Sequence, residues 1–143
     1  MDNKILIVED NSDDEMLLLR QLKKANLDQH IKVIRDGRKA LGYLTEAGGN
    51  GDHLAAVFLD LGLPAIHGVQ LLEAIRADER LRLLPVVVMT SSNDPDEMEK
   101  CRELGVSCYV QKPLTFSSFV KAFADVFRAQ REVPCTAWER ACE

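Results

Sequence analysis

The sequence predicts an α/β fold in which a five-stranded parallel sheet is doubly wound between two layers of helices, a three-layer αβα arrangement. Short apolar runs alternate with helical patterns along nearly the whole chain. Alternation of this kind requires a mostly parallel sheet with right-handed crossovers. The length of 143 residues suits one domain with a substantial core. For five strands the common order is 2-1-3-4-5, with the switch point between the first and third strands.

The expected strands are short runs of large apolar residues. The run Lys4–Val8 is β-branched at alternate positions and stops at Glu9, which is typical of a strand buried on both faces. The second run is closed by Asp36 and Gly37, and the fourth is opened by Pro85. In chain order, the expected strands are 4–8, 31–34, 55–59, 86–89 and 107–111.

The expected helices follow the strands, and two of them have clear start signals. Ser12 and Glu15 have the spacing of a capping box, with acidic residues in the first turn that suit the helix dipole. Asp94 and Pro95 predict a helix start, with Asp as the cap and Pro at the first helical position. The last helix carries a stripe of phenylalanines that we interpret as core. In chain order, the expected helices are 12–26, 38–45, 69–77, 94–104 and 116–131.

Composition and charge exclude several classes of function. A net charge of −5 argues against broad nucleic-acid binding. No apolar stretch approaches the roughly 20 residues of a membrane span, and the first residues lack the pattern of a signal peptide. The 4 cysteines form no C-x-x-C pair, which argues against zinc. We therefore expect a cytoplasmic protein with reduced thiols. Residues 1–131 would form its one domain and 132–143 a short C-terminal tail, with no output domain.

Polar side chains follow four of the five expected strands. Glu9 and Asp10 end the first strand, Asp60 the third, Thr90 the fourth and Lys112 the fifth. Ligands of doubly wound sheets bind at this carboxyl edge. Carboxylates so close together repel, so either one stays protonated or a cation lies between them. Oxygen ligands suit Mg²⁺, and a carboxylate in this place can be a nucleophile that forms an aspartyl phosphate.

The segments at these strand ends resemble the receiver domain of two-component response regulators. The resemblance covers about Lys4 to Arg128 and implies a flavodoxin-like fold. It rests on all the segments occurring in order, each at the end of an expected strand. These segments are Ile7–Asn11, Phe58–Pro64 with Gly68, Val88–Ser92 and Tyr109–Pro113.

The resemblance also implies a role for each residue at the sheet edge. Mg²⁺ would be the cofactor, and a phosphoryl group would be carried on one aspartate. The implied roles are Asp60 as phosphoacceptor; Glu9 and Asp10 as the acid pair; Asp10, Asp60 and the Gly62 carbonyl as metal ligands; Thr90 and Lys112 as contacts of the phosphoryl group; and Tyr109 as the aromatic switch.

Within that family, the long stretch between Tyr43 and Asp60 is similar to stand-alone regulators that pair with phytochrome-type histidine kinases. The resemblance implies a partner sensor histidine kinase, of which the phytochrome type is one class, and signalling by conformational switching or protein interaction. It implies no enzyme activity beyond self-phosphorylation and autodephosphorylation. A phosphotransfer shuttle or phosphate sink in a phosphorelay is an alternative. An Asp-based phosphatase is disfavoured, because Gly62 stands where such enzymes need a second acid.

Several other residues have simpler interpretations. Asp13 and Asp14 are expected to act as helix-start residues, since capping explains them. His67 replaces the acid common in the family before Gly68, and we expect no catalytic part for it. Resembling stand-alone regulators imply a homodimer through the fourth helix, fifth strand and fifth helix, to which Trp138 in the tail would add contact area.

Overall fold

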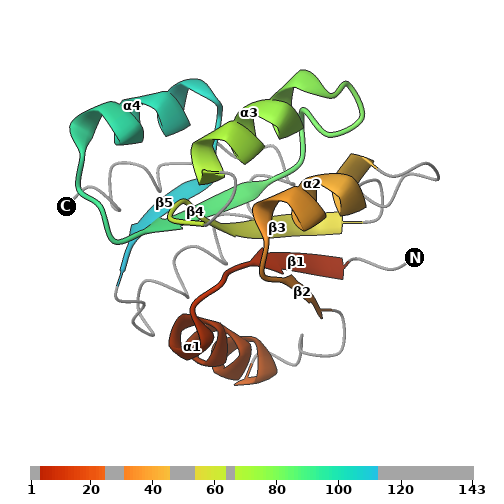
Figure 1. The fold of residues 1–143 in the computed structure, drawn as a ribbon, viewed down its shortest axis with the longest axis vertical. Helices are drawn as coiled ribbons and strands as arrows, with labels where there is room; N and C mark the ends of the chain where they lie inside the picture. The colour runs from red at the N-terminus through yellow and green to blue at the C-terminus, as the bar shows by residue number, and fades with distance from the viewer. Residues whose placement is uncertain (1–3, 25–30, 46–53, 64–66, 113–143) are drawn as a thin grey trace.

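Five parallel strands form one sheet in the order β2-β1-β3-β4-β5 in the computed structural model of the chain (Figure 1). The structure describes residues 4–24, 31–45, 54–63 and 67–112. The predicted direction and order of the strands are confirmed. The strands are β1 (Lys4–Val8), β2 (Ile31–Ile34), β3 (Leu54–Asp60), β4 (Val86–Thr90) and β5 (Cys108–Gln111).

Among the described helices, α1 covers one face of the sheet, and α2, α3 and α4 cover the other (Figure 1). None of these helices is long and apolar enough to cross a bilayer. The expected helix over 116–131, the domain boundary at 131 and the tail 132–143 lie outside the described residues. The described helices are α1 (Ser12–Lys24), α2 (Gly37–Thr45), α3 (Gly68–Ala77) and α4 (Pro95–Glu103).

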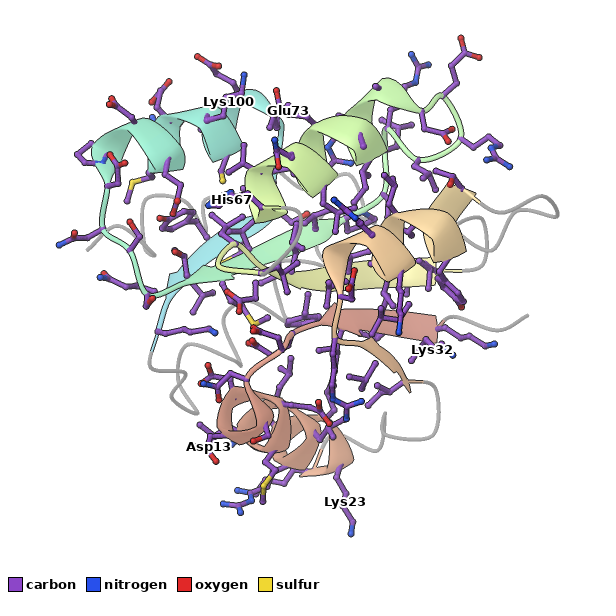
Figure 2. The ribbon with its side chains drawn as sticks, in the orientation of Figure 1. Asp13, Lys23, Lys32, His67, Glu73 and Lys100 are labelled. Atoms are coloured by element: carbon purple, nitrogen blue, oxygen red, sulfur yellow. The ribbon has the colours of Figure 1, made fainter. Side chains whose placement is uncertain are left out.

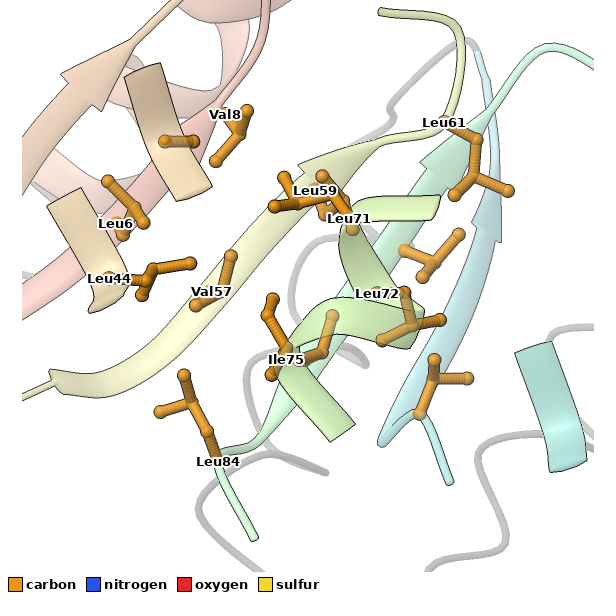
Figure 3. Packing of buried hydrophobic residues seen from close by; sticks show 14 of the residues in the cluster. Leu6, Val8, Leu44, Val57, Leu59, Leu61, Leu71, Leu72, Ile75 and Leu84 are labelled. Atoms are coloured by element: carbon orange, nitrogen blue, oxygen red, sulfur yellow. The ribbon is translucent and has the colours of Figure 1, made fainter. Parts of the chain in front are cut away.

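The strands contribute apolar side chains to both faces, which is why they lack polar alternation. Along β1, Ile5 and Ile7 pack on the α1 side, whereas Leu6 and Val8 pack against the layer of α2 and α3. Figure 3 shows the cluster that contains Leu6 and Val8, where side chains of β1 and β3 meet those of α2 and α3. Each fully buried Leu or Ile contributes about 1.5–3 kcal/mol relative to an exposed one. The sheet is therefore a rigid support for the residues at its carboxyl edge.

Of the two helix starts predicted from clear signals, one differs in the structure and one is confirmed. The predicted capping box at Ser12 is wrong, because the Asn11 side chain caps α1 instead. Its Oδ1 accepts from the backbone N–H of Asp13 at 2.9 Å and of Asp14 at 3.0 Å. The predicted cap of α4 is confirmed: Asp94 accepts from the backbone N–H of Asp96 at 3.0 Å.

A third cap was not foreseen in the sequence. His67 caps α3 through Nδ1, which accepts from the Val69 N–H at 3.2 Å, and Gln70 completes the capping box. Gly68 follows, packed so closely on the Leu61 backbone that a side chain there would collide with it. Cap and close contact together fix the start of α3 against the loop that follows Asp60.

Candidate functional site

The predicted site residues lie at the carboxyl edge of the sheet. Asp60 and Thr90 are the last residues of β3 and β4, while Glu9 and Lys112 directly follow β1 and β5. Hydrogen bonds of the sheet extend past the strand ends to hold them. The Glu9 N–H donates to a β2 carbonyl at 3.1 Å, and the Lys112 N–H donates to the Thr90 carbonyl at 2.7 Å. Backbone hydrogen bonds of the sheet therefore fix the positions of Glu9 and Lys112.

One ammonium group joins three carboxylates at this edge. Lys112 Nζ lies 2.7 Å from Asp14 Oδ2, 2.9 Å from Glu9 Oε1 and 3.3 Å from Asp60 Oδ2. The other Asp60 oxygen, Oδ1, accepts from the Gly62 N–H at 3.0 Å. We call these four charged side chains (Glu9, Asp14, Asp60 and Lys112) the acid pocket. Its open side is a cavity of about 620 Å³, which Asp10, Gly62 and Ser91 also line.

The acid pocket shifts the protonation of its own members. The pKa of Glu9 is raised to about 8, chiefly because burial disfavours the charged form and also because Glu9 hydrogen-bonds to Asp60. Burial acts to raise the pKa of Asp60 as well, but hydrogen bonds from Glu9, the Gly62 N–H and Lys112 outweigh it and lower that pKa. Burial acts to lower the pKa of Lys112, but the hydrogen bonds to Asp14 and Glu9 outweigh burial, and the pKa of Lys112 is raised. Of this pair of acids, Asp60 is therefore the more readily ionised and Glu9 the more readily protonated.

The same edge can hold a metal ion. One carboxylate oxygen each from Glu9, Asp10 and Asp60 lies within 4.8 Å of the other two. Glu9 Oε1 is buried, and its close positive partner is the Lys112 ammonium at 2.9 Å. Such an oxygen has capacity for a further positive partner. An all-oxygen donor set fits a hard divalent cation, so the sequence-predicted residues fit the metal they were expected to bind.

Thr90 and Tyr109 lie together, but in a second group of side chains that faces α4. Thr90 Oγ1 donates to Glu97 Oε1 at 3.1 Å, and the Tyr109 hydroxyl donates to the same oxygen at 3.5 Å. His67 Nε2 lies 3.9 Å from Glu97 Oε2; Figure 2 labels His67 at the start of α3. We call Thr90, Tyr109, Glu97 and His67 the hydroxyl cluster. The expected contact of Thr90 with a phosphoryl group would require its hydroxyl to leave Glu97.

Two residues of these groups were not assigned to the site from the sequence. Asp14 does lie in the first turn of α1, as expected. It is also the carboxylate nearest to the Lys112 ammonium. Asp14 follows Asp10 by four residues, and both side chains line the same cavity, so this nearness in the sequence is a usable signal. Glu97 lies on the polar surface of α4, and the sequence carries no comparable signal for it.

A larger cavity of about 660 Å³ lies at the opposite edge of the sheet, around Arg76. The Arg76 guanidinium donates to the backbone carbonyls of Leu84 and Leu104, both at 2.7 Å, and to further carbonyls nearby. It ties the end of α3 to the segments that precede β4 and β5. This arrangement explains the half-buried guanidinium as a structural element.

The fold and the edge define a class of protein: a doubly wound α/β domain with an acidic cation site and a lysine at its switch point. The comparison with known families identifies it more closely. The chain belongs to the response regulator receiver domain family, whose match spans residues 5–124.

Relatives of known name agree with this assignment. The chain is 37% identical to the probable methanogenesis regulatory protein FilR2 of Methanothrix harundinacea over 123 residues, which cover 85% of the chain and 79% of that protein. Among solved structures, the bacteriophytochrome response regulator RtBRR has a TM-score of 0.76 and 40% identity, covering 88% of this chain and 78% of that one. The Mn²⁺-bound form of response regulator Rcp1 has a TM-score of 0.75 and 30% identity, covering 94% of this chain and 99% of that one. A response regulator named Rcp1 is found in Synechocystis.

Proposed function

We propose that the chain is a single-domain response regulator that accepts a phosphoryl group from a sensor histidine kinase on Asp60, in a Mg²⁺-dependent reaction. The observation that carries the proposal is the setting of Asp60 at the end of β3. Its Oδ2 lies 3.3 Å from the Lys112 ammonium, and its Oδ1 is fixed by the Gly62 N–H. A carboxylate held in this way, in a chain of the receiver family, is positioned and charged for phosphoryl transfer.

The chain's own residues provide position and charge. Asp60 is the more readily ionised of the two buried acids and lies at the end of β3 beside Lys112, so we assign it as the nucleophile. The new bond joins an Asp60 Oδ atom to phosphorus, while the bond from phosphorus to the donor breaks and its electron pair leaves with the donor. Lys112 neutralises charge on the phosphoryl oxygens. Phosphoryl loss by hydrolysis is the only other reaction in the proposal, which includes no turnover of external substrates.

The cofactor proposal is Mg²⁺, held by Asp10, Asp60 and the Gly62 carbonyl with Glu9 beside them. When bound, it would neutralise the acids and the incoming phosphoryl oxygens. The oxygen donor set supports this proposal, and so does the Mn²⁺ ion of the Rcp1 structure. With the cation in place Glu9 is expected to ionise, since its raised pKa arises from burial beside another acid.

The proposed kinase is of the phytochrome type. The titles of the similar structures support this, since RtBRR is a bacteriophytochrome response regulator and RcpA is a phytochrome response regulator. A cytoplasmic setting is proposed with it, supported by Cys101 and Cys108 as free thiols. A role as phosphate shuttle or sink uses the same chemistry and is distinguished by onward transfer to a histidine-containing protein. For a phosphatase, Gly62 offers no general acid.

The assembly we propose is a homodimer through α4, β5 and the expected last helix. The burial of Tyr109 beneath α4 supports a surface there that responds to the site. Light scattering at micromolar concentration, with and without phosphodonor and with reductant present, is expected to give the mass of two chains. A mass of one chain in both conditions would rule the dimer out.

The phosphoacceptor is tested by substitution. Wild type incubated with a small phosphodonor and Mg²⁺ is expected to gain one phosphoryl group by intact mass, and Asp60→Asn none, because an amide is not a nucleophile here. Asp10→Asn is expected to lower labelling through loss of metal. Equal labelling of Asp60→Asn and wild type would disprove the assignment of Asp60.

A further inference from the structure

Lys112 makes its shortest contact with a residue that has no part in the proposed chemistry. Asp14 Oδ2 lies 2.7 Å from Lys112 Nζ, whereas Asp60 Oδ2 lies 3.3 Å away. The side chains of Lys112 and Asp14 are only 12% and 18% exposed, so water screens the pair little. The pair links the start of α1 to the end of β5, and it draws the ammonium away from the phosphoacceptor.

An ammonium group has three N–H donors, and here three carboxylates surround it. A phosphoryl group on Asp60 presents several new anionic oxygens, so Lys112 must release Glu9 or Asp14 to give more than one of its donors to them. Glu9 is a poor choice, because it is 1% exposed and its Oε2 also accepts from the Asn11 N–H at 3.2 Å. Asp14 lies in the first turn of α1 and lines the open cavity. It is the contact that can be exchanged at lowest cost.

We propose that Asp14 is a positioning residue that holds Lys112 in the unphosphorylated state and thereby limits the rate at which Asp60 is phosphorylated. The inference rests on the proposed function and adds a regulation of the same site. Asp14 slows the reaction in two ways. It competes with the arriving phosphoryl oxygens for the ammonium, and its own charge repels an anionic phosphodonor from the cavity.

The chain provides a matched control for this proposal. Asp13 lies in the same turn of α1, is exposed, and its N–H is bonded to the Asn11 cap in the same way. Figure 2 shows Asp13 directed away from the sheet. Neutralising Asp13 therefore removes the same charge from the same helix start without touching Lys112. If Asp14 were only a helix-start residue, the two substitutions would have equal effects.

The experiment compares Asp14→Asn, Asp14→Glu, Asp13→Asn and wild type. Each is incubated with acetyl phosphate and Mg²⁺, and labelling is followed by intact mass over a range of donor concentrations. We expect Asp14→Asn to raise the initial rate at low donor by at least about threefold, through a lower half-saturating donor concentration and a higher maximal rate. Asp13→Asn should stay within about twofold of wild type, and Asp14→Glu should restore the slow rate.

An Asp14→Asn rate at or below that of wild type would overturn the proposal, and so would an equal acceleration by Asp13→Asn. Failure of wild type to be labelled would instead count against the proposed function. Folding of each variant is checked by circular dichroism. Should Asp14→Asn not fold, Asp14→Ser takes its place, because it removes the same charge and retains a side chain suited to a helix start. The same rates would then support or overturn the proposal.

Discussion

The acid pocket and the hydroxyl cluster lie at the same edge of the sheet, yet they hold their carboxylates by different means. In the acid pocket a full positive charge, Lys112, lies 2.7–3.3 Å from three carboxylates. In the hydroxyl cluster Glu97 is contacted by two neutral hydroxyls at 3.1 and 3.5 Å, and by the His67 imidazole only at 3.9 Å. Only the acid pocket is held by close ionic contacts.

This difference in bonding indicates which region can rearrange. Removing one partner from a buried ion pair costs about 3–5 kcal/mol, whereas a hydrogen bond from a neutral hydroxyl to a carboxylate contributes about 1.5–3 kcal/mol. The hydroxyl cluster can therefore exchange partners with a smaller change in free energy. Its members come from β4, α4, β5 and the cap of α3, so a movement of Thr90 reaches several elements at once. We infer that the acid pocket sets the chemistry and the hydroxyl cluster relays it.

The largest effect is expected from removing the positive charge of the acid pocket. Lys112→Met leaves three carboxylates without their cation and is expected to lower the unfolding free energy of the metal-free protein by about 3 kcal/mol. Added Mg²⁺ should restore part of that loss, because it neutralises the same oxygens. Urea denaturation with and without Mg²⁺ measures both.

Lys100→Met is the control for that measurement. Lys100 lies 3.5 Å from Glu73, and both side chains are nearly half exposed (Figure 2). An exposed pair of this kind contributes at most about 1 kcal/mol. Equal losses in the two lysine variants would mean that the acid pocket is no more strongly coupled than an ordinary surface pair.

A smaller effect on stability is expected from a substitution at Gly68, which lies between Asp60 of the acid pocket and His67 of the hydroxyl cluster. A Cβ at Gly68 would collide with the Leu61 backbone and would lie 2.7 Å from the Asp60 carbonyl oxygen. Gly68→Ala is therefore expected to lower the unfolding free energy by about 2 kcal/mol, the usual scale of overpacking. Because it displaces the loop beside Asp60 and the cap at His67, it should also reduce phosphorylation.

Gly42→Ala supplies the matched comparison for Gly68→Ala. Gly42 lies inside α2 with open space where a Cβ would be. Alanine there is expected to raise the unfolding free energy by about 0.5–1 kcal/mol, because it restricts the unfolded chain and favours the helix. Destabilisation of both variants to the same extent would contradict the role given to the contact of Gly68.

The same comparison explains how much of the site could be predicted from the sequence. Asp60 and Lys112 were predictable because strands buried on both faces are continuous apolar runs, and the polar residues that end them must meet at one edge. Asp14 was interpreted as a helix-start residue and Glu97 was not considered, because each lies on a helix whose polar residues are also explained by capping or solvent contact. Their partners depend on how the helix packs, which periodicity does not specify.

Local competition also limited what the sequence could specify at helix starts. Asn11 and Ser12 are both good caps, and the sequence pattern favoured Ser12 through Glu15. In the structure Glu15 instead forms an ion pair with Arg35 at 2.9 Å. A tertiary contact thus decided which of two adjacent residues caps α1.

The smallest effect on stability, and the most direct test of the relay, is expected from the hydroxyl cluster. Thr90→Ala removes one donor to Glu97 and the acceptor of the Ser92 N–H, which is 3.0 Å from Thr90 Oγ1. It should lower the unfolding free energy by about 1.5 kcal/mol, the lower end for a hydrogen bond to a carboxylate, and leave Asp60 open to phosphorylation. Hydrogen exchange of the α4 amides should change on phosphorylation in wild type and in Thr90→Ser, which keeps the hydroxyl, but not in Thr90→Ala. An α4 response in Thr90→Ala as large as in wild type would mean that the signal leaves the acid pocket by another route. In that case the weak bonding of Glu97 would have no part in the switch.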